Sequence, residues 1–473
     1  FGMVYLPYGV TNNESGFRTV SKPVRTTEDL KGLRLRVSGL EQGKLLEKLG
    51  GSQVSTTAVN GLLSVGNPNG ATIVSVQSPS ALGGTITANA DGSFTYNAPP
   101  TVGNDTFTFT LQNSGGNSTA QVTVNLVARG FFVKNDAPAG GNGSQAAPFQ
   151  TLAQGVAAAA GVNGAQIVVF RGNGANYPDS VTLSANQVLR AFDSTTPPNL
   201  SGTVTVGSNC TLNALNLSNS PTAAVVANGV TGGTFTNLTI TSPGSDGITM
   251  TNPSGSLLIR NVNITNVGTN GQSLPMATST SANLVLENIT VTNNTRIVHL
   301  VDIAGAAVVN ETLTNWSITG GGSGNGCGYT ANSTTNVTVT ATNFTLNGGG
   351  IGFGGQTFNS ARGTFLLSGL TITNCTAEGV FLIAADNSTL KSRLQSSRLT
   401  GNGNGGFASQ SSTNGQLCLR LTNNTSDIYE FNQDGNSTTA VENFGNFTTE
   451  NIGNISVLAG IVTSVPLGSC LIP

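Results

Sequence analysis

The chain has 473 residues, of which only 8% are charged, and its formal net charge at pH 7 is -2. Its polarity comes from Asn, Thr and Ser, which argues against a nucleic-acid-binding protein, because such proteins need clustered Lys and Arg. No apolar run approaches the roughly 18 residues of a membrane-spanning helix. The length exceeds one ordinary core, so we expect several domains or a solenoid.

Residues 1–54 differ from the rest of the chain in their charge and form the first predicted domain, a short α/β fragment. Eight basic and five acidic side chains fall within the first 51 residues. A capped helical turn is expected at 26–32, a strand at 33–37 and a short amphipathic helix at 40–49. The chain begins with Phe and shows no signal-peptide pattern, so we expect a mature product, an engineered chain or an internal fragment.

One stretch, from Lys22 to Val37, reads KPVRTTEDLKGLRLRV and closely resembles the solute-binding proteins of TRAP-type transporters. The resemblance implies that Arg36 binds the carboxylate of an organic acid, a task for which a planar guanidinium is suited. That family needs two α/β lobes and a cleft, whereas the match here ends near Val54. The alternative is an orphan fragment without a ligand site.

Residues 55–128 form the second predicted domain, a small antiparallel β-sandwich. Alternating strands are expected at 84–89 and 91–96 around a turn, and again at 105–111 and 120–126. Inward Phe and Val with outward Thr suit such a sandwich. The pattern resembles the cadherin-like and immunoglobulin-like modules of bacterial surface proteins.

Two turn aspartates of this second domain, Asp91 and Asp105, are candidate ligands for Ca²⁺. The alternative is that each carboxylate caps its own turn, as isolated turn aspartates usually do. No other cofactor is expected.

The third predicted domain, residues 129–425, begins with a strand at 131–133 and an Ala-rich helix that ends at Ala160. We expect this helix to cover the open end of a solenoid, because uncovered strand edges recruit other chains. Beyond residue 425 the repeat is lost, and residues 426–473 are expected to form a few last strands and a C-terminal cap.

A sequence repeat organises the third domain and is clearest around Asn288, in the stretch LVLENITVT. Apolar residues two positions before, one after and three after Asn288 predict two short strands that meet in a bend at this frame position. Copies recur every 22–28 residues, which indicates a solenoid. The frame positions fall at 214, 237, 261, 288, 315, 343, 369, 396 and 418.

Asn or Gly at the frame position predicts a left-handed corner, because these residues adopt that conformation most readily. Stacked asparagine amides are then expected to hydrogen-bond from coil to coil. The predicted ladder comprises Asn237, Asn261, Asn288, Asn315, Asn343 and Gly369. Other residues at the outer copies are expected to fray the ladder at both ends, namely Ala214, Ser396 and Cys418.

These repeats resemble the right-handed parallel β-helix of the pectate-lyase fold, whose coils carry such a ladder, and the long bacterial surface proteins built of β-strand repeats. The predicted fold class is therefore mainly β: a right-handed parallel β-helix preceded by a small immunoglobulin-like β-sandwich and a short α/β fragment. The resemblance leaves the chemistry open, because this fold carries lyases, hydrolases, tailspikes and adhesins.

Ionisable residues are sparse in the β-helix, and the compact set is Arg296, His299 and Asp302. Because side chains alternate along a strand, His299 and Asp302 are expected to face opposite sides. A surface cluster is therefore favoured, with His299 and Asp302 kept as catalytic candidates. A second acidic patch is expected to be a solvated turn or an ion site; it consists of Asp427, Glu430 and Asp434.

Five cysteines are scattered along the chain without metal-ligand spacing: Cys210, Cys327, Cys375, Cys418 and Cys470. Two interpretations stay open. Cys418 and Cys470 form a disulfide that closes the C-terminal region, or all the cysteines are small buried residues between coils.

Together these features favour an extracellular or surface-displayed bacterial protein, with the periplasm as the alternative location. The expected function is adhesion or structural display by a stiff rod that contacts glycans or other cell-surface components and self-associates along its length. Whether the chain is an enzyme stays open: a polysaccharide lyase or glycoside hydrolase is one alternative, and TRAP-type binding of an organic acid is another. Neither a nucleic-acid partner nor a membrane-spanning segment is expected.

Overall fold

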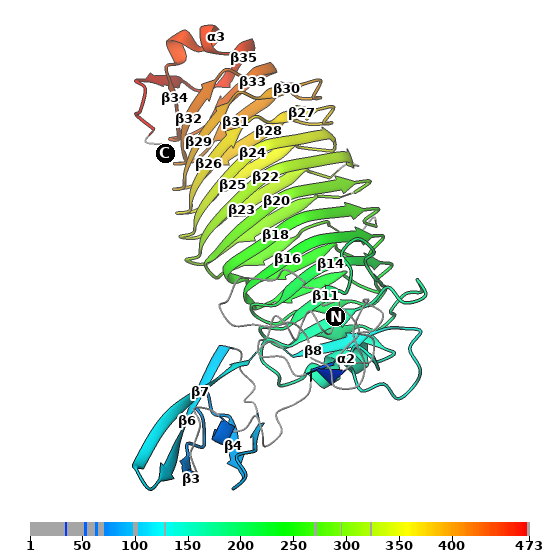
Figure 1. Cartoon of the computed structure of the whole chain (residues 1–473). Coiled ribbons are helices and arrows are strands. Elements are labelled where there is room, and N and C mark those ends of the chain that lie inside the picture. The colour runs from blue at the N-terminus through cyan, green and yellow to red at the C-terminus, as the bar shows by residue number, and fades with distance from the viewer. Residues whose placement is uncertain are drawn as a thin grey trace, which may run out of the picture. The chain divides into compact units, whose positions relative to one another are not determined.

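The computed structural model describes residues 71–97, 103–126, 129–268, 272–294, 296–321 and 324–470, with three short elements nearer the N-terminus. These elements are the parallel pair β1 (Arg34–Leu35) and β2 (Ser52–Gln53) and the 3-10 helix η3 (Leu62–Ser64). The chain divides into two compact units, Phe1–Leu126 and Val127–Pro473, and each unit is described by itself (Figure 1).

Five strands of the first unit form two antiparallel sheets. In one sheet β6 (Gly103–Asn113) lies between β3 (Thr72–Val76) and β7 (Gly116–Leu126); in the other β4 (Thr85–Ala88) pairs with β5 (Phe94–Asn97). Their buried core consists of Leu62, Ile86, Phe107 and Phe109. The small antiparallel β-sandwich predicted from the sequence is confirmed.

The second unit is a parallel β-helix, in which successive coils place their strands side by side in three stacks (Figure 1). In each coil the first stack comes before the corner at the frame position. Its strands are β8 (Gly130–Val133), β9 (Gln166–Val169), β11 (Val188–Ala191), β14 (Thr211–Ser218), β16 (Thr231–Thr241), β18 (Ser254–Thr265), β20 (Ala282–Thr292), β22 (Val308–Gly321), β24 (Asn336–Gly348), β26 (Arg362–Ser368), β29 (Thr389–Gln395), β32 (Gln416–Thr422), β34 (Thr438–Glu442) and β36 (Val462–Val465).

The second and third stacks complete each coil. The second stack continues the long strands past the corner and adds β12 (Asn199–Leu200), β27 (Thr371–Thr373), β30 (Arg398–Thr400) and the starts of β33 (Thr425–Gln433) and β35 (Ile452–Ala459). The third stack contains the later parts of β33 and β35 and the strands β10 (Val181–Thr182), β13 (Val204–Thr205), β15 (Val225–Asn228), β17 (Ile248–Thr251), β19 (Met276–Thr278), β21 (His299–Ile303), β23 (Cys327–Ala331), β25 (Phe353–Thr357), β28 (Val380–Ala384) and β31 (Phe407–Ser411).

Side chains alternate between the interior and the solvent along each stack, as the pleat of a strand requires. In β20 the side chains of Leu286, Ile289 and Val291 are fully buried, whereas Asn288 is exposed. These are the apolar positions that the repeat predicts. Stacking the coils joins their apolar residues into one continuous core.

The corner between the first and second stacks is left-handed at eight frame positions, from Ala214 to Ser396, with φ between 51° and 66°. The prediction for the last copy is wrong, because Cys418 lies within β32. The corner of that coil is formed by Asn423, whose φ is 55°. An apolar pattern alone does not locate the bend, whereas Asn423 is a residue that tolerates it.

A ladder of asparagine side chains runs along this corner. From Asn261 to Asn343, four asparagines each donate a hydrogen bond from Nδ2 to Oδ1 of the asparagine one coil earlier, at 2.8–3.2 Å. Asn237 donates instead to Asn213, at 2.8 Å. Gly369 keeps the left-handed conformation but has no side-chain amide, so the ladder ends there.

The N-terminal end of the β-helix is covered by helix α2 (Leu152–Ala159), close to the predicted position. Thr151 and Gln154 form a capping box that satisfies the first backbone N–H groups of α2. Leu152 and Ala159 are fully buried in the solenoid core. This helix therefore shields the first coil from solvent at that end.

Parallel pairing continues beyond residue 425, where the sequence repeat is no longer recognisable. β33 pairs with β30 and β31, β34 with β32, β35 with β33, and β36 with β34. Two short helices lie between β34 and β35, namely η4 (Phe444–Asn446) and α3 (Phe447–Glu450). A disulfide joins Cys418 to Cys470, and the other three cysteines are buried.

Within the described ranges, no helix has the length and apolar character needed to cross a membrane.

Candidate functional site

An open hollow lies on the outer face of the third stack, where β17, β19, β21 and β23 end. Its volume is about 410 Å³, and successive coils contribute to its lining. The polar residues in this lining are Thr251, Asn252, Thr278, Ser279, Asp302, Thr330 and Asn332. Asp302 is the one ionisable group of the lining; it is exposed, and it has no ion-pair or hydrogen-bond partner among the described residues.

Two asparagines of the hollow are held in fixed orientations. Oδ1 of Asn252 accepts hydrogen bonds from the backbone N–H of Ser279, at 2.9 Å, and from its hydroxyl, at 3.2 Å. Oδ1 of Asn332 accepts from Nδ2 of Asn359 in the next coil. Since both carboxamide oxygens are engaged, the Nδ2 groups remain as donors, and Asp302 supplies an acceptor.

His299 lies in the interior of the β-helix, so the expected surface cluster is wrong for this residue. Its side chain is fully buried, with Nδ1 2.6 Å from the carbonyl oxygen of Leu274. Nε2 lies 2.9 Å from Oε1 of Glu311, which is also buried and comes from the first stack. Asp302, three residues later in the same strand, is exposed on the opposite face, so the two candidates do not meet.

Aromatic rings and a thiol surround the buried His299–Glu311 pair. The rings of Trp316 and Tyr329 lie 5.7 and 5.8 Å from the His299 ring, between centroids. Burial is the main cause that raises the pKa of the Tyr329 hydroxyl and of the Cys327 thiol well above their ordinary values, and the negative charge of Glu311 is the second cause. Both groups stay protonated and lie away from solvent, so this cluster is an internal polar element of the core.

The predicted C-terminal acidic patch is divided among different roles. Asp427 accepts hydrogen bonds from the backbone N–H groups of Gly401, at 2.6 Å, and Asn402, at 3.3 Å, and so caps a corner. Burial, followed by the negative charge of Glu378, raises the pKa of Glu430. The carboxylate that interacts with Glu430 is thus Glu378, from an earlier coil, which sequence proximity does not reveal.

The two aspartates proposed for Ca²⁺ are engaged in hydrogen bonds. Asp91 accepts from the backbone N–H and the hydroxyl of Ser93, at 3.0 and 2.7 Å. Asp105 is buried and accepts from the hydroxyls of Ser80 and Tyr96 and from two backbone N–H groups. In the part of the chain that the structure describes, no group of three or more His, Cys, Asp or Glu side chains is arranged to hold a metal ion.

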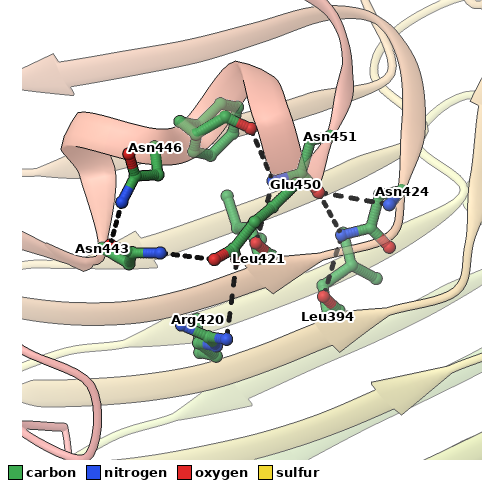
Figure 2. A network of polar contacts seen from close by, with 9 residues as sticks. Leu394, Arg420, Leu421, Asn424, Asn443, Asn446, Glu450 and Asn451 are labelled. Atoms are coloured by element: carbon green, nitrogen blue, oxygen red, sulfur yellow. Dashed lines mark hydrogen bonds and ion pairs between the residues drawn. The ribbon is translucent and has the colours of Figure 1, made fainter.

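A polar network fastens the last corner of the β-helix (Figure 2). Glu450 forms an ion pair with Arg420, at 3.5 Å, and accepts a hydrogen bond from Asn443. Asn451 donates to the carbonyl oxygen of Leu421 at 2.9 Å, and Asn424 donates to Oδ1 of Asn451 at 3.0 Å. These bonds satisfy backbone groups at a corner, so the network is structural.

One family match falls within the first unit. Residues 49–125 match the family described as Bacterial Ig domain. No curated protein matches the chain. The comparisons give no support to the TRAP-type resemblance of the first 51 residues, and Arg36 lies outside the described residues.

Three solved structures to which the chain is similar are glycoside hydrolases. The catalytic unit of a thermostable GH87 α-1,3-glucanase from Streptomyces thermodiastaticus strain HF3-3 is 14% identical, with a TM-score of 0.35 over 80% of this chain and 76% of that chain. The GH136 lacto-N-biosidase of Eubacterium ramulus is 9% identical, with a TM-score of 0.27 over 72% and 68%. The family 28 exopolygalacturonase of Yersinia enterocolitica is 11% identical, with a TM-score of 0.24 over 75% and 84%. At these values the likeness gives no basis for transferring a substrate or a catalytic residue.

Proposed function

We propose that this chain is a bacterial surface or extracellular protein that binds glycans through the hollow around Asp302. The observation that supports the proposal is the lining of this hollow, where successive coils place two oriented amides, several hydroxyls and one unpaired carboxylate. Each saccharide hydroxyl both donates and accepts a hydrogen bond. A carboxylate between amide donors is therefore suited to two neighbouring hydroxyls of one sugar ring.

An open site of this kind fits binding at moderate affinity. The hollow is not enclosed, so a bound sugar keeps part of its hydration, and the site accepts a residue within a longer chain. The low charge of the whole protein suits a neutral polysaccharide better than a polyanion. The proposed ligand class is therefore a neutral glycan of a cell surface or matrix.

Binding is tested with a glycan array probed by the 473-residue protein, followed by calorimetry with the best ligand. Asp302→Ala removes a charge-assisted hydrogen bond worth about 1.5–3 kcal/mol, so the affinity should fall roughly 10- to 100-fold. Asp434→Ala is the matched control, because Asp434 is also exposed and its carboxylate has no partner among the described residues. Glycan binding that survives Asp302→Ala unchanged excludes this hollow.

A second candidate function, glycoside hydrolysis, is favoured by Glu378 and Glu430. Glu378 lies just before β28 and Glu430 lies in β33, two coils later, and both side chains are partly exposed. Burial, followed by the negative charge of Glu378, raises the pKa of Glu430, as suits a general acid. Incubation of the bound polysaccharide with the protein tests this function by measuring new reducing ends. Product release that disappears in Glu430→Gln supports hydrolysis, whereas binding without products supports the glycan-binding proposal.

The proposed location outside the cytoplasm rests on two further observations. Residues 49–125 match a bacterial Ig domain, and the Cys418–Cys470 disulfide persists in oxidising compartments. Fractionation of the native cells with an antibody to this chain tests the location. Recovery of the protein in the cytoplasm with free Cys418 and Cys470 contradicts it.

A further inference from the structure

One short side chain in an outward column of the third stack gives the hollow around Asp302 its depth. In this column Ala277 of β19 lies between Thr251 of β17 and Asp302 of β21. The other members of the column are all longer than alanine: Asn228, Thr251, Asp302, Thr330, Gln356, Ile383, Gln410 and Asn432. The methyl group of Ala277 therefore forms an apolar floor between two polar walls.

A second alanine extends this floor. The backbone N–H of Ala304 donates to the carbonyl oxygen of Thr278 in β19, at 3.0 Å, so the strand alternation continues past Asp302 and the Ala304 methyl group faces the same side. Ala277 and Ala304 are both exposed, and both line the hollow. A sugar hydroxyl placed on these methyl groups would lose water without gaining a hydrogen bond, so a ligand that fills the hollow should carry a methyl group of its own.

The two walls beside Ala277 differ in their hydrogen-bonding character. Asp302 offers carboxylate oxygens, which only accept hydrogen bonds, whereas the hydroxyl of Thr251 and Nδ2 of Asn252 on the other side offer donors. The backbones that carry the two walls are two strand spacings apart, or roughly 9–10 Å. A planar secondary amide has its N–H and C=O on opposite sides, so it can donate to one wall and accept from the other. An amide that ends in a methyl group thus matches the floor and both walls.

We infer that the hollow binds the acetamido group of an N-acetylated amino sugar, an inference that rests on the glycan-binding function proposed above and names the ligand of the same site. The amide N–H donates to one carboxylate oxygen of Asp302, and the amide oxygen accepts from Thr251 or Asn252. The methyl group packs on Ala277 and Ala304, and the other oxygen of Asp302 accepts from the hydroxyl next to the acetamido group. Such sugars are uncharged, as the low charge of the chain favours.

Calorimetry of the 473-residue protein with matched pairs of tetrasaccharides tests this inference. Within a pair the linkage is the same, and the sugars are N-acetylglucosamine against glucose, or N-acetylgalactosamine against galactose. In one pair or both the acetylated member should bind at least about tenfold tighter, because its amide N–H meets a charged acceptor and its methyl group is buried. Asp302→Ala should remove most of this difference.

Ala277→Val tests the floor of the hollow. The added methyl groups occupy the space of the acetamido group, so the affinity for the acetylated sugar should fall at least about tenfold while the circular dichroism of the fold is kept. Gln356→Val is the matched control, because it places the same side chain in the same column outside the hollow, and it should bind like wild type. Saturation-transfer NMR of the wild type gives a second readout, in which the acetyl methyl protons should receive the strongest transfer.

The outcomes separate this inference from the glycan-binding proposal. Binding that depends on Asp302 but is equally tight for both members of each pair, or that survives Ala277→Val unchanged, overturns the acetamido assignment and leaves the glycan-binding proposal intact. Absence of binding in every pair and on the glycan array, or binding that is unchanged in Asp302→Ala, overturns both.

Discussion

At the scale of single residues, the clearest departure from an apolar core is the His299–Glu311 pair. The residues that pair with Glu311 in the adjacent coils are Leu284 and Val339, so two apolar positions flank one carboxylate. Burying an ion pair costs desolvation, and removing one partner leaves the other uncompensated. Glu311→Ala should therefore destabilise the β-helix by about 3–5 kcal/mol, measured by denaturant unfolding.

A matched double variant separates the charge from the packing. His299→Leu with Glu311→Leu leaves no unpaired buried charge and should cost much less than Glu311→Ala alone. If the double variant is as unstable as the single one, the pair acts through its shape and its hydrogen bonds, and the electrostatic explanation fails.

The same pair predicts how stability depends on pH. Burial lowers the pKa of His299, but the negative charge of Glu311, the hydrogen bond to it and the Leu274 carbonyl outweigh burial, so the pKa is raised overall. A raised folded-state pKa stabilises the protein fully below the unfolded value of about 6.5, and this contribution disappears as the pH rises through the folded value. The melting temperature of the β-helix should therefore be highest below about pH 6.5 and fall as the pH rises above that value.

His299 is the one histidine of the chain, which makes the pH test specific. In the variant with leucine at 299 and 311 the decline of the melting temperature above neutrality should disappear. An unchanged slope in that variant would assign the pH dependence to other groups.

Asp105 plays the corresponding part in the immunoglobulin-like unit. Burial opposes ionisation of Asp105, but hydrogen bonds from Ser80, Tyr96 and the N–H groups of Leu82 and Thr106 outweigh it and lower its pKa. Because the pKa of Asp105 is lowered by folding, its ionised carboxylate stabilises the unit at pH values above the unfolded pKa of about 3.9. This stabilisation is lost as the pH falls through the folded-state pKa. Asp105→Asn should lower the melting temperature of this unit near neutral pH and reduce its sensitivity to acid.

Asp91→Asn is the control for Asp105→Asn, because Asp91 is exposed and bonds only within its own turn. Its effect on the melting temperature should be small. Comparable losses in the two variants would contradict a special role for the buried carboxylate.

At the scale of the structural element, each corner combines a backbone conformation with a side-chain bond. Asn288 has φ of 57°, donates to Asn261 and accepts from Asn315. Asn288→Ala should cost about 1–2 kcal/mol for the left-handed conformation and about 1 kcal/mol for each lost hydrogen bond. Asn288→Gly should lose the hydrogen bonds but not the conformational preference, so it should be the milder change.

Hydrogen exchange of the amides around 261, 288 and 315 measures both variants of Asn288. The method is suited to a solenoid, whose unfolding need not be two-state. Equal effects of alanine and glycine would show that the backbone conformation contributes little.

The corners also show which elements the sequence predicts. Asn237 to Asn343 are recognisable because one residue type satisfies both the left-handed φ and the ladder, whereas Ala214 and Ser396 occupy the same conformation without that signature. The apolar residues around Cys418 resemble the repeat and so predict a corner there, yet Cys418 lies in β32 and forms a disulfide with Cys470. The spacing of residues predicts a corner correctly where the residue at the corner itself favours the left-handed conformation. The prediction fails where contacts with the neighbouring coil determine the position of the corner.

At the scale of the whole molecule, the candidate site cannot be predicted from short stretches of sequence, because contacts between coils form it. Asn252, Ser279, Asp302 and Thr330 are separated by a coil or more in sequence and meet only when the coils stack in register. His299 and Glu311 likewise meet from opposite walls of one coil. The sequence predicts the solenoid and the direction in which each side chain points, but a site that spans coils requires the lengths of the intervening turns.

A solenoid in which each coil contacts only its neighbours should also lose structure locally, coil by coil. At the C-terminal end the Cys418–Cys470 disulfide ties the chain after β36 to β32 across 52 residues. By the loop-entropy estimate, such a cross-link is worth about 4 kcal/mol. Cys470→Ser should therefore speed hydrogen exchange in β34, β35 and β36 while leaving β20 and β22 unchanged. Faster exchange along the whole β-helix would mean that the coils unfold as one cooperative unit, and unchanged exchange in β35 would mean that the network around Glu450 holds this end without the disulfide.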